Sequence, residues 1–173
     1  YRQKEHLKAY HVATAESISL ETNYEEELRK VGSQLGYPFM LKSKKEAYDG
    51  RGNFPVKSES DVSAALEALG KNALYAERWA DFRMELAVMI VKTKDGTLAF
   101  PTVETHHENS ICKLVWAPAR NVSADVGRRA QGLARKAVAG FEGKGVFGVE
   151  MFLLKDDSLL INEIAPRPHN VSF

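Results

Sequence analysis

Cysteine is almost absent from this sequence, and so are long hydrophobic runs. The 173 residues include a single cysteine, Cys112, which cannot form an internal disulfide bond. One thiol fits a reducing compartment, and we expect a cytoplasmic protein. No apolar run is long enough to span a membrane and no signal-peptide core is visible, so no membrane partner is expected. Cys112 stands in a strand-like run and is predicted to be a small buried residue rather than a nucleophile.

The sequence also lacks an excess of charge of either sign. Its 24 basic residues balance 23 acidic residues, which leaves a net charge of +1. Because no face-wide basic excess is implied, nucleic acid is not expected as a partner. With 44% hydrophobic residues, the chain can bury a core as one domain with two lobes.

The first half has the pattern of a small α/β lobe. Apolar residues at helical spacing predict helices, and short apolar runs between them predict strands. Ser60 is expected to cap the third helix. The predicted elements are helices over 3–10, 22–35 and 62–69, strands over 37–42 and 73–77, a polar loop over 43–53, and one more strand between that loop and the helix over 62–69.

The second half has the pattern of an antiparallel sheet with one long helix. An Asp95-Gly96 pair predicts a hairpin turn between strands over 84–91 and 98–103. A further strand is predicted over 111–116, and Ser123 is expected to cap a helix that runs to Phe141. The predicted fold class is therefore α+β, with two lobes that face a cleft.

Two carboxylates, Glu150 and Glu163, stand in apolar runs near the end of the chain. A hairpin folded about the bond between Asp156 and Asp157 places them directly opposite each other, on the same face. Carboxylates this close repel each other unless one is protonated or a cation lies between them. Mg²⁺ is the cation expected between them, since it binds carboxylate oxygens and often coordinates phosphates at the same time. The alternative is that both glutamates face solvent without a role.

A loop with two glycines follows Lys42, which lies at the end of a predicted strand. Backbone N–H groups and the guanidinium of Arg51 can close over an anion, and Lys42 adds a point charge for phosphate. The alternative is an ordinary hairpin loop with an arginine at the surface. No Walker motif is present. The G-x-G-x-x-G match at 143–148 follows a helix and opens a strand, the reverse of the dinucleotide-binding context.

Three further segments carry residues suited to a nucleotide or an anion. The segment 77–80 joins the two lobes and can present backbone groups to adenine, while Glu85 can accept hydrogen bonds from a ribose. Solvated acidic residues at strand ends are the alternative. His106 and His107 lack partners for a metal site and are instead candidates for ligand contact. Prolines stiffen the tail that follows Glu163, and Arg167 within it suits a planar anion.

In this order, these motifs resemble those of the ATP-grasp ligases. The resemblance covers nearly the whole chain. It is closest to the N5-carboxyaminoimidazole ribonucleotide synthetases, and above all to the fungal phosphoribosylaminoimidazole carboxylases, in which this synthetase is fused to a mutase. The glycine loop and the Asn-Glu-Ile-Ala-Pro-Arg-Pro-His-Asn segment are the most specific parts.

The resemblance implies an ATP-grasp fold with a small lid lobe over about 12–78, a larger lobe over about 79–173 and the nucleotide between them. It implies a ligase that makes carboxyphosphate from ATP and bicarbonate and carboxylates aminoimidazole ribonucleotide in purine biosynthesis. In the fused enzyme the mutase adds lyase, or decarboxylase, chemistry. Another ATP-grasp carboxylase or ligase, and a non-catalytic nucleotide-binding module, remain the alternatives.

The resemblance also implies a role for each motif residue. The ATP-binding residues would be Lys42, Ala47, Tyr48, Asp49, Gly50, Arg51, Gly52, Asn53, Glu77, Arg78, Trp79, Ala80, Glu85, His107, Asn162 and Glu163. Mg²⁺ would be bound by Glu150 and Glu163. The catalytic residues that face bicarbonate and carboxyphosphate would be Arg167, His169 and Asn170.

The chain departs from the family pattern at its end. The family continues with Ser-Gly-His after His-Asn, whereas this sequence reads Val171-Ser172-Phe173. The family also has a domain on either side of the ATP-grasp core, through which a homo-oligomer can form. We therefore expect the 173-residue fragment alone to bind ATP weakly and to turn over little.

Overall fold

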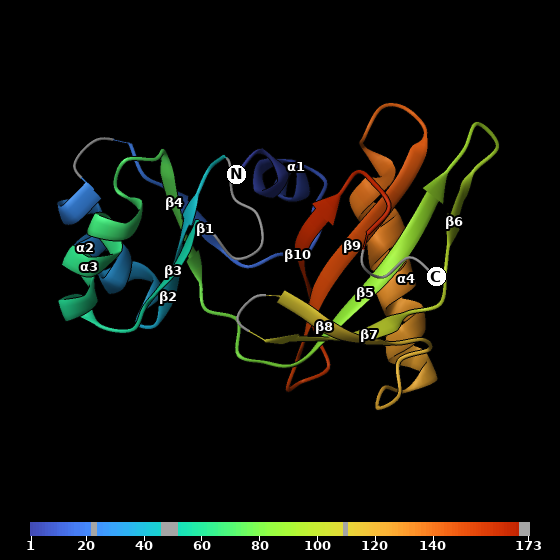
Figure 1. Ribbon diagram of the computed structural model, residues 1–173. Helices are drawn as coiled ribbons and strands as arrows, with labels where there is room; N and C mark the ends of the chain where they lie inside the picture. The colour runs from blue at the N-terminus through green and yellow to red at the C-terminus, as the bar shows by residue number, and fades with distance from the viewer. Residues whose placement is uncertain (22–23, 46–51, 109–110, 170–173) are drawn as a thin grey trace. The chain divides into compact units, whose positions relative to one another are not determined.

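A computed structural model describes residues 1–21, 24–45, 52–108 and 111–169, which fold into two compact units (Figure 1). Unit 1 comprises residues 1–4 and 15–80, and unit 2 comprises residues 5–14 and 81–173. The chain passes between the units three times: within the first helix, α1 (Arg2–Ala9), between Thr14 and Ala15, and between Ala80 and Asp81. The α+β class is confirmed, while the functional lobe boundaries at about 12–78 and 79–173 stay a prediction.

Unit 1 is a four-stranded antiparallel sheet with two helices on one face. The strand order is β1-β4-β2-β3. The strands are β1 (Ser17–Ser19), β2 (Phe39–Ser43), β3 (Asn53–Val56) and β4 (Leu74–Arg78), and the helices are α2 (Tyr24–Leu35) and α3 (Val62–Leu69). Phe39, Leu41 and Ala76 pack with the apolar stripes of the helices. Because side chains alternate along a strand, Lys42, Tyr75 and Glu77 lie on the opposite face.

The start of α3 differs from the prediction. A single 3₁₀ turn, η1 (Glu59–Asp61), precedes the helix, so Ser60 lies within that turn and does not cap α3. The carboxylate of Asp61 instead accepts hydrogen bonds from the backbone N–H groups of Lys57 and Ser58, at 2.8 and 2.9 Å. Asp61 therefore satisfies donors at the entry to the turn.

Unit 2 is built on a second antiparallel sheet, in the order β10-β9-β5-β7-β8, with β6 paired to β5 (Figure 1). The strands are β5 (Phe82–Lys92), β6 (Thr97–Ala99), β7 (Val103–Glu108), β8 (Ile111–Trp116), β9 (Gly145–Leu154) and β10 (Leu159–Ala165). The hairpin turn at Asp95-Gly96 is confirmed by the pairing of β5 with β6. The single strand predicted over 98–103 is wrong. Pro101 lies in the gap between β6 and β7, and proline offers no N–H group to a strand ladder.

Helix α4 (Ala124–Ala139) covers one face of this sheet. Its predicted cap is confirmed, since the Ser123 hydroxyl accepts the backbone N–H of Val126 at 3.2 Å. Ala130, Ala134 and Ala137 are fully buried, and their small side chains let the helix lie close to the strands. In the part of the chain described, no helix is long and apolar enough to cross a membrane.

Candidate functional site

The first candidate group is the carboxylate pair on β9 and β10. Glu150 pairs directly with Glu163 in the antiparallel ladder, as predicted. The reasoning behind that prediction was only partly right, however. Nearer the turn, Ile161 pairs with Met151, and the register then shifts by one residue between Ile161 and Glu163.

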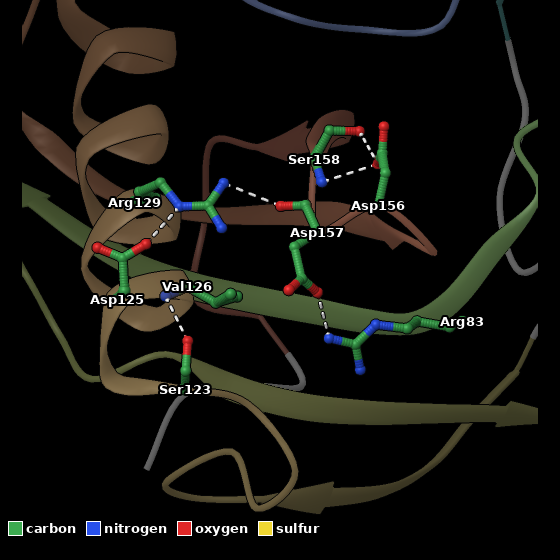
Figure 2. Close-up of polar contacts among 8 residues, drawn as sticks. All are labelled: Arg83, Ser123, Asp125, Val126, Arg129, Asp156, Asp157 and Ser158. Carbon is green, nitrogen blue, oxygen red and sulfur yellow. Dashed lines mark hydrogen bonds and ion pairs between the residues drawn. The ribbon is translucent and has the colours of Figure 1, made fainter.

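The turn of this hairpin explains the first part of the difference (Figure 2). The predicted fold about the Asp156–Asp157 bond is wrong, because the loop has three residues, Lys155 to Asp157. Leu154 N–H donates to the carbonyl of Ser158 at 2.9 Å, and Asp157 adopts a positive φ of 63°. A three-residue hairpin loop commonly ends on such a left-handed residue. The loop is therefore centred on Asp156.

Contacts from two other elements of unit 2 hold this turn. Arg83 of β5 donates to the Asp157 carboxylate at 2.5 Å. Arg129 of α4 donates to the backbone carbonyl of Asp157 at 2.9 Å and to Asp125 (Figure 2). The side chain and the backbone carbonyl of Asp157 are thus both held, and these two contacts support its positive φ.

A β-bulge at Asn162 restores the pairing of the two glutamates. Ile161 and Ile164 are both buried in the core, with 0% and 1% of their surface exposed. The two residues between them, Asn162 and Glu163, therefore lie on the other face of the strand, across from Glu150. A bulge characteristically re-aims side chains in this way. The bulge thus places the side-chain amide of Asn162 on the same face as the two carboxylates.

The electrostatics of the pair favour a cation. Burial, followed by the nearby Glu163 carboxylate, raises the pKa of Glu150 to about 7. Within the described ranges, no group of three or more His, Cys, Asp or Glu side chains is arranged to hold a metal ion. Two carboxylates nevertheless fit Mg²⁺, which is usually held by one or two of them and completed by phosphates and water. The donor set therefore fits magnesium, and the ion itself stays a prediction.

A histidine–carboxylate pair lies on the neighbouring strands. His107 Nδ1 lies 2.7 Å from Glu85 Oε2, and this hydrogen bond is the main cause of a raised pKa of His107. Cys112 pairs with His107 across β7 and β8. Cys112 is only partly buried, contrary to the prediction, and burial raises the pKa of its thiol above the ordinary value. A raised pKa leaves less of the thiol in the reactive thiolate form.

The tail after β10 brings one predicted catalytic residue to the carboxylates. His169 Nε2 lies 3.4 Å from Glu150 Oε1, and burial lowers the pKa of His169. The imidazole packs directly on Gly148, where an added methyl group would lie 2.5 Å from the His169 Cβ. Arg167 donates to the carbonyl of Pro168 at 3.1 Å and is exposed. Asn170 lies outside the described residues.

The second candidate group lies in unit 1, around Glu77. This carboxylate is 3% exposed, and it lies 3.0 Å from the ammonium of Lys4 and 3.5 Å from that of Lys42. Lys42 pairs with Asn53 across β2 and β3, and Ser43 N–H donates to the carbonyl of Gly52 at 2.8 Å. The predicted contacts Ala47, Tyr48, Asp49, Gly50 and Arg51 lie outside the described residues.

The predicted adenine segment has its arginine engaged within unit 1. The Arg78 guanidinium donates to the Glu16 carboxylate and to the carbonyl of Leu35, both at 2.8 Å. Trp79 is 41% exposed. An adenine contact through the backbone of this segment stays a prediction.

Sequence reasoning missed two residues of these groups, Lys4 and Gly148. Lys4 precedes Glu77 by 73 residues, so the ion pair has no local pattern. Gly148 had a weak signal, since it lies two residues before Glu150 on a strand, where glycine often marks a close approach.

Comparison with known proteins gives a consistent picture. The model of the ATP-grasp domain family matches residues 5–172. The chain is 55% identical over 171 residues to phosphoribosylaminoimidazole carboxylase of Candida albicans. That alignment covers 98% of this chain and 30% of the Candida protein. It is 39% identical over 145 residues to N5-carboxyaminoimidazole ribonucleotide synthase of Bacillus subtilis, covering 83% of this chain and 38% of that protein. The chain thus spans about a third of these curated relatives.

Solved structures match over nearly the whole chain. Carboxyaminoimidazole ribonucleotide synthase of Aspergillus clavatus, complexed with ATP, aligns with a TM-score of 0.95 at 65% identity. The A. clavatus enzyme in complex with ADP and 5-aminoimidazole ribonucleotide aligns with a TM-score of 0.92 at 62% identity. Each alignment covers 97% of this chain and 44% of the other.

Proposed function

This chain belongs to the ATP-grasp family, and we propose that the protein from which it comes uses ATP and bicarbonate to carboxylate aminoimidazole ribonucleotide in purine biosynthesis. The observation that carries the proposal is the 65% identity, at a TM-score of 0.95, to a carboxyaminoimidazole ribonucleotide synthase complexed with ATP. The direct opposition of Glu150 and Glu163 supports it, because a phosphoryl-transfer enzyme needs such a metal site.

ATP is the proposed cosubstrate and Mg²⁺ the proposed metal. Lys42 would place its charge on the phosphates, and Glu85 would accept hydrogen bonds from the ribose. Glu150 and Glu163 would hold Mg²⁺, with the Asn162 amide beside them. When bound, the metal would neutralise charge on the phosphates. His107, held by Glu85 at 2.7 Å, would add a further contact to the nucleotide.

The tail is the proposed site of bicarbonate. Arg167 would bind a planar anion through two N–H groups, and its exposed guanidinium has only the Pro168 carbonyl as a hydrogen-bond partner among the described contacts. His169 would lie between that anion and Glu150, and Asn170 completes the proposed set. The three residues would orient bicarbonate for attack on the terminal phosphorus of ATP, so that carboxyphosphate forms and ADP leaves.

The proposal extends to the whole protein. By the family pattern it would carry a carboxyaminoimidazole ribonucleotide mutase, which accounts for lyase or decarboxylase activity, and it would act in the cytoplasm. Homo-oligomers would form through segments other than the 173 residues. ATP binding and turnover by those residues alone would be weak.

The decisive experiment is an assay of the full-length protein for ADP release. We expect release to require bicarbonate and to be stimulated by aminoimidazole ribonucleotide, and labelled bicarbonate should appear in the carboxylated product. Stimulation by a different acceptor would assign the protein to another ATP-grasp carboxylase or ligase. No ATP turnover under any of these conditions would instead indicate a nucleotide-binding module.

The metal assignment has its own test in the same protein. Glu163→Gln keeps the size of the side chain and removes one charge from the proposed ligand set. We expect turnover to be lost while the circular dichroism spectrum stays that of the wild type. Near-normal turnover would remove Glu163 from the metal site.

A further inference from the structure

Unit 1 contains a charge relationship that the family motifs do not include. We propose that Lys4 is a positioning residue, whose ammonium neutralises the buried Glu77 carboxylate so that the ammonium of Lys42 stays available to an anionic ligand. The inference rests on the proposed function, in which that anion is a phosphate of ATP.

The geometry gives Glu77 two lysines at unequal distances. Lys4 Nζ donates a hydrogen bond to Oε1 at 3.0 Å. Lys42 Nζ lies 3.5 Å from Oε2, which is buried and accepts no hydrogen bond among the described residues. Lys4 is therefore the bonded partner of Glu77, and Lys42 is a neighbouring charge.

Burial makes this difference between the two lysines important. The side chains of Lys4 and Glu77 are each 4% exposed, whereas that of Lys42 is 17% exposed. A buried carboxylate is stable only beside a positive charge or hydrogen-bond donors, because its own charge is poorly solvated. Without Lys4, the nearest described cation is Lys42, and we expect its ammonium to turn toward Glu77. A lysine bound in this way has less of its charge to offer to a phosphate.

The start of the chain is held in place on this face of the sheet. The Tyr1 ring lies 5.2 Å from that of Tyr75, measured between centroids. Tyr75 precedes Glu77 by two residues on β4, so both side chains lie on the face opposite the helices. Lys4 N–H donates to the carbonyl of Tyr1 at 2.8 Å. Tyr1 and Lys4 thus cover the same face that carries Lys42.

The test uses the full-length protein and compares Lys4→Met with Lys8→Met from the same helix. The Lys8 side chain is 44% exposed and lies 3.8 Å from Glu5, so its removal matches the loss of charge and length without touching Glu77. We expect Lys4→Met to raise the KM for ATP about tenfold with a smaller change in kcat, and Lys8→Met to leave both unchanged. Lys4→Arg keeps the charge and should recover most of the affinity.

A wild-type KM for ATP in Lys4→Met would overturn the proposal. So would an equal rise in Lys4→Met and Lys8→Met, since that rise would come from overall charge. If the wild type itself shows no ATP turnover, the proposed function fails first. The role of Lys4 is then read from the binding of Mg²⁺–ATP by calorimetry, in which the same ranking of variants is expected.

Lys4→Met leaves a buried charge and threatens folding, so a double-mutant cycle with Glu77→Gln provides a second test. The double variant removes both charges and leaves Lys42 without a competing carboxylate. We expect its KM for ATP to be lower than the product of the two single fold-changes predicts. Strictly multiplicative effects would show that Lys4 does not act through Glu77, and would overturn the proposal.

Discussion

The carboxylate pair predicts an unusual dependence of stability on pH in the metal-free chain. The pKa of Glu150 is about 7 in the folded chain, against an ordinary value of 4.5. Between these values the folded state binds more protons at this carboxyl than the unfolded state does, so stability falls as the pH rises. The stability that the protonated Glu150 contributes is fully present below pH 4.5 and is lost as the pH rises past 7. The gap corresponds to about 3 kcal/mol in the free energy of unfolding.

Glu150→Gln isolates this contribution, because glutamine has no proton to lose. Urea unfolding from about pH 5 to about pH 8 should show the variant gaining about 2.5 kcal/mol relative to the wild type as the pH rises. His107 and His169 have pKa values shifted in opposite directions and both interact with Glu150, so their titration must be followed by NMR in both proteins. Glu67→Gln, at an exposed position of α3, is the matched control for the loss of a carboxyl that does not lie opposite Glu163.

Two results would refute the reasoning. Parallel stability curves for the wild type and Glu150→Gln would mean that Glu150 titrates alike in the folded and unfolded states. An NMR titration of the Glu150 carboxyl carbon with a midpoint near the ordinary pKa of glutamate would show directly that folding does not raise the pKa of Glu150. If the pair also holds Mg²⁺, saturating metal should flatten the wild-type curve, since the ion keeps both carboxylates charged.

Three further substitutions test contacts elsewhere in unit 2. Gly148→Ala should displace the imidazole of His169, so that the lowered pKa of His169, followed by NMR, rises toward its ordinary value; an unchanged titration would contradict the packing. Lys92→Met should lower the free energy of unfolding by about 1–2 kcal/mol, because the Lys92 ammonium binds the carbonyls of Val138, Ala139 and Phe141 at the end of α4. Gly132→Ala should raise the free energy of unfolding by about 0.5–1 kcal/mol, since this exposed helical position has open space for a methyl group; urea unfolding measures both effects.

The elements of the fold could be predicted from the sequence because their signals are local. The Asp95-Gly96 turn and the Ser123 cap each depend on residues a few positions apart, and both are confirmed. The break at Pro101 was also readable in principle, because proline has no N–H group for a strand ladder. Treating 98–103 as one strand ignored that signal.

The register of the last hairpin was predicted correctly for an incomplete reason. A two-residue loop without a bulge and a three-residue loop with a bulge at Asn162 both place Glu163 opposite Glu150. The alternation of apolar residues does not separate them, because Ile161 and Ile164 are compatible with either until their burial is known. Sequence patterns specify which face must be buried, but not how many residues the turn uses to achieve it.

Contacts between distant segments explain both the missed residues and the stability of the site. A hairpin that places two carboxylates face to face works against its own pairing, because their repulsion favours a slipped or opened register. Two constraints oppose the slip. Arg83 and Arg129, from β5 and α4, hold Asp157 at the turn. Within the hairpin, the buried side chains of Ile161 and Ile164 lie on either side of the bulge. A one-residue slip would carry an isoleucine to the polar face and a glutamate into the core. That exchange would expose apolar surface and bury a charge, so it opposes the slip that repulsion favours.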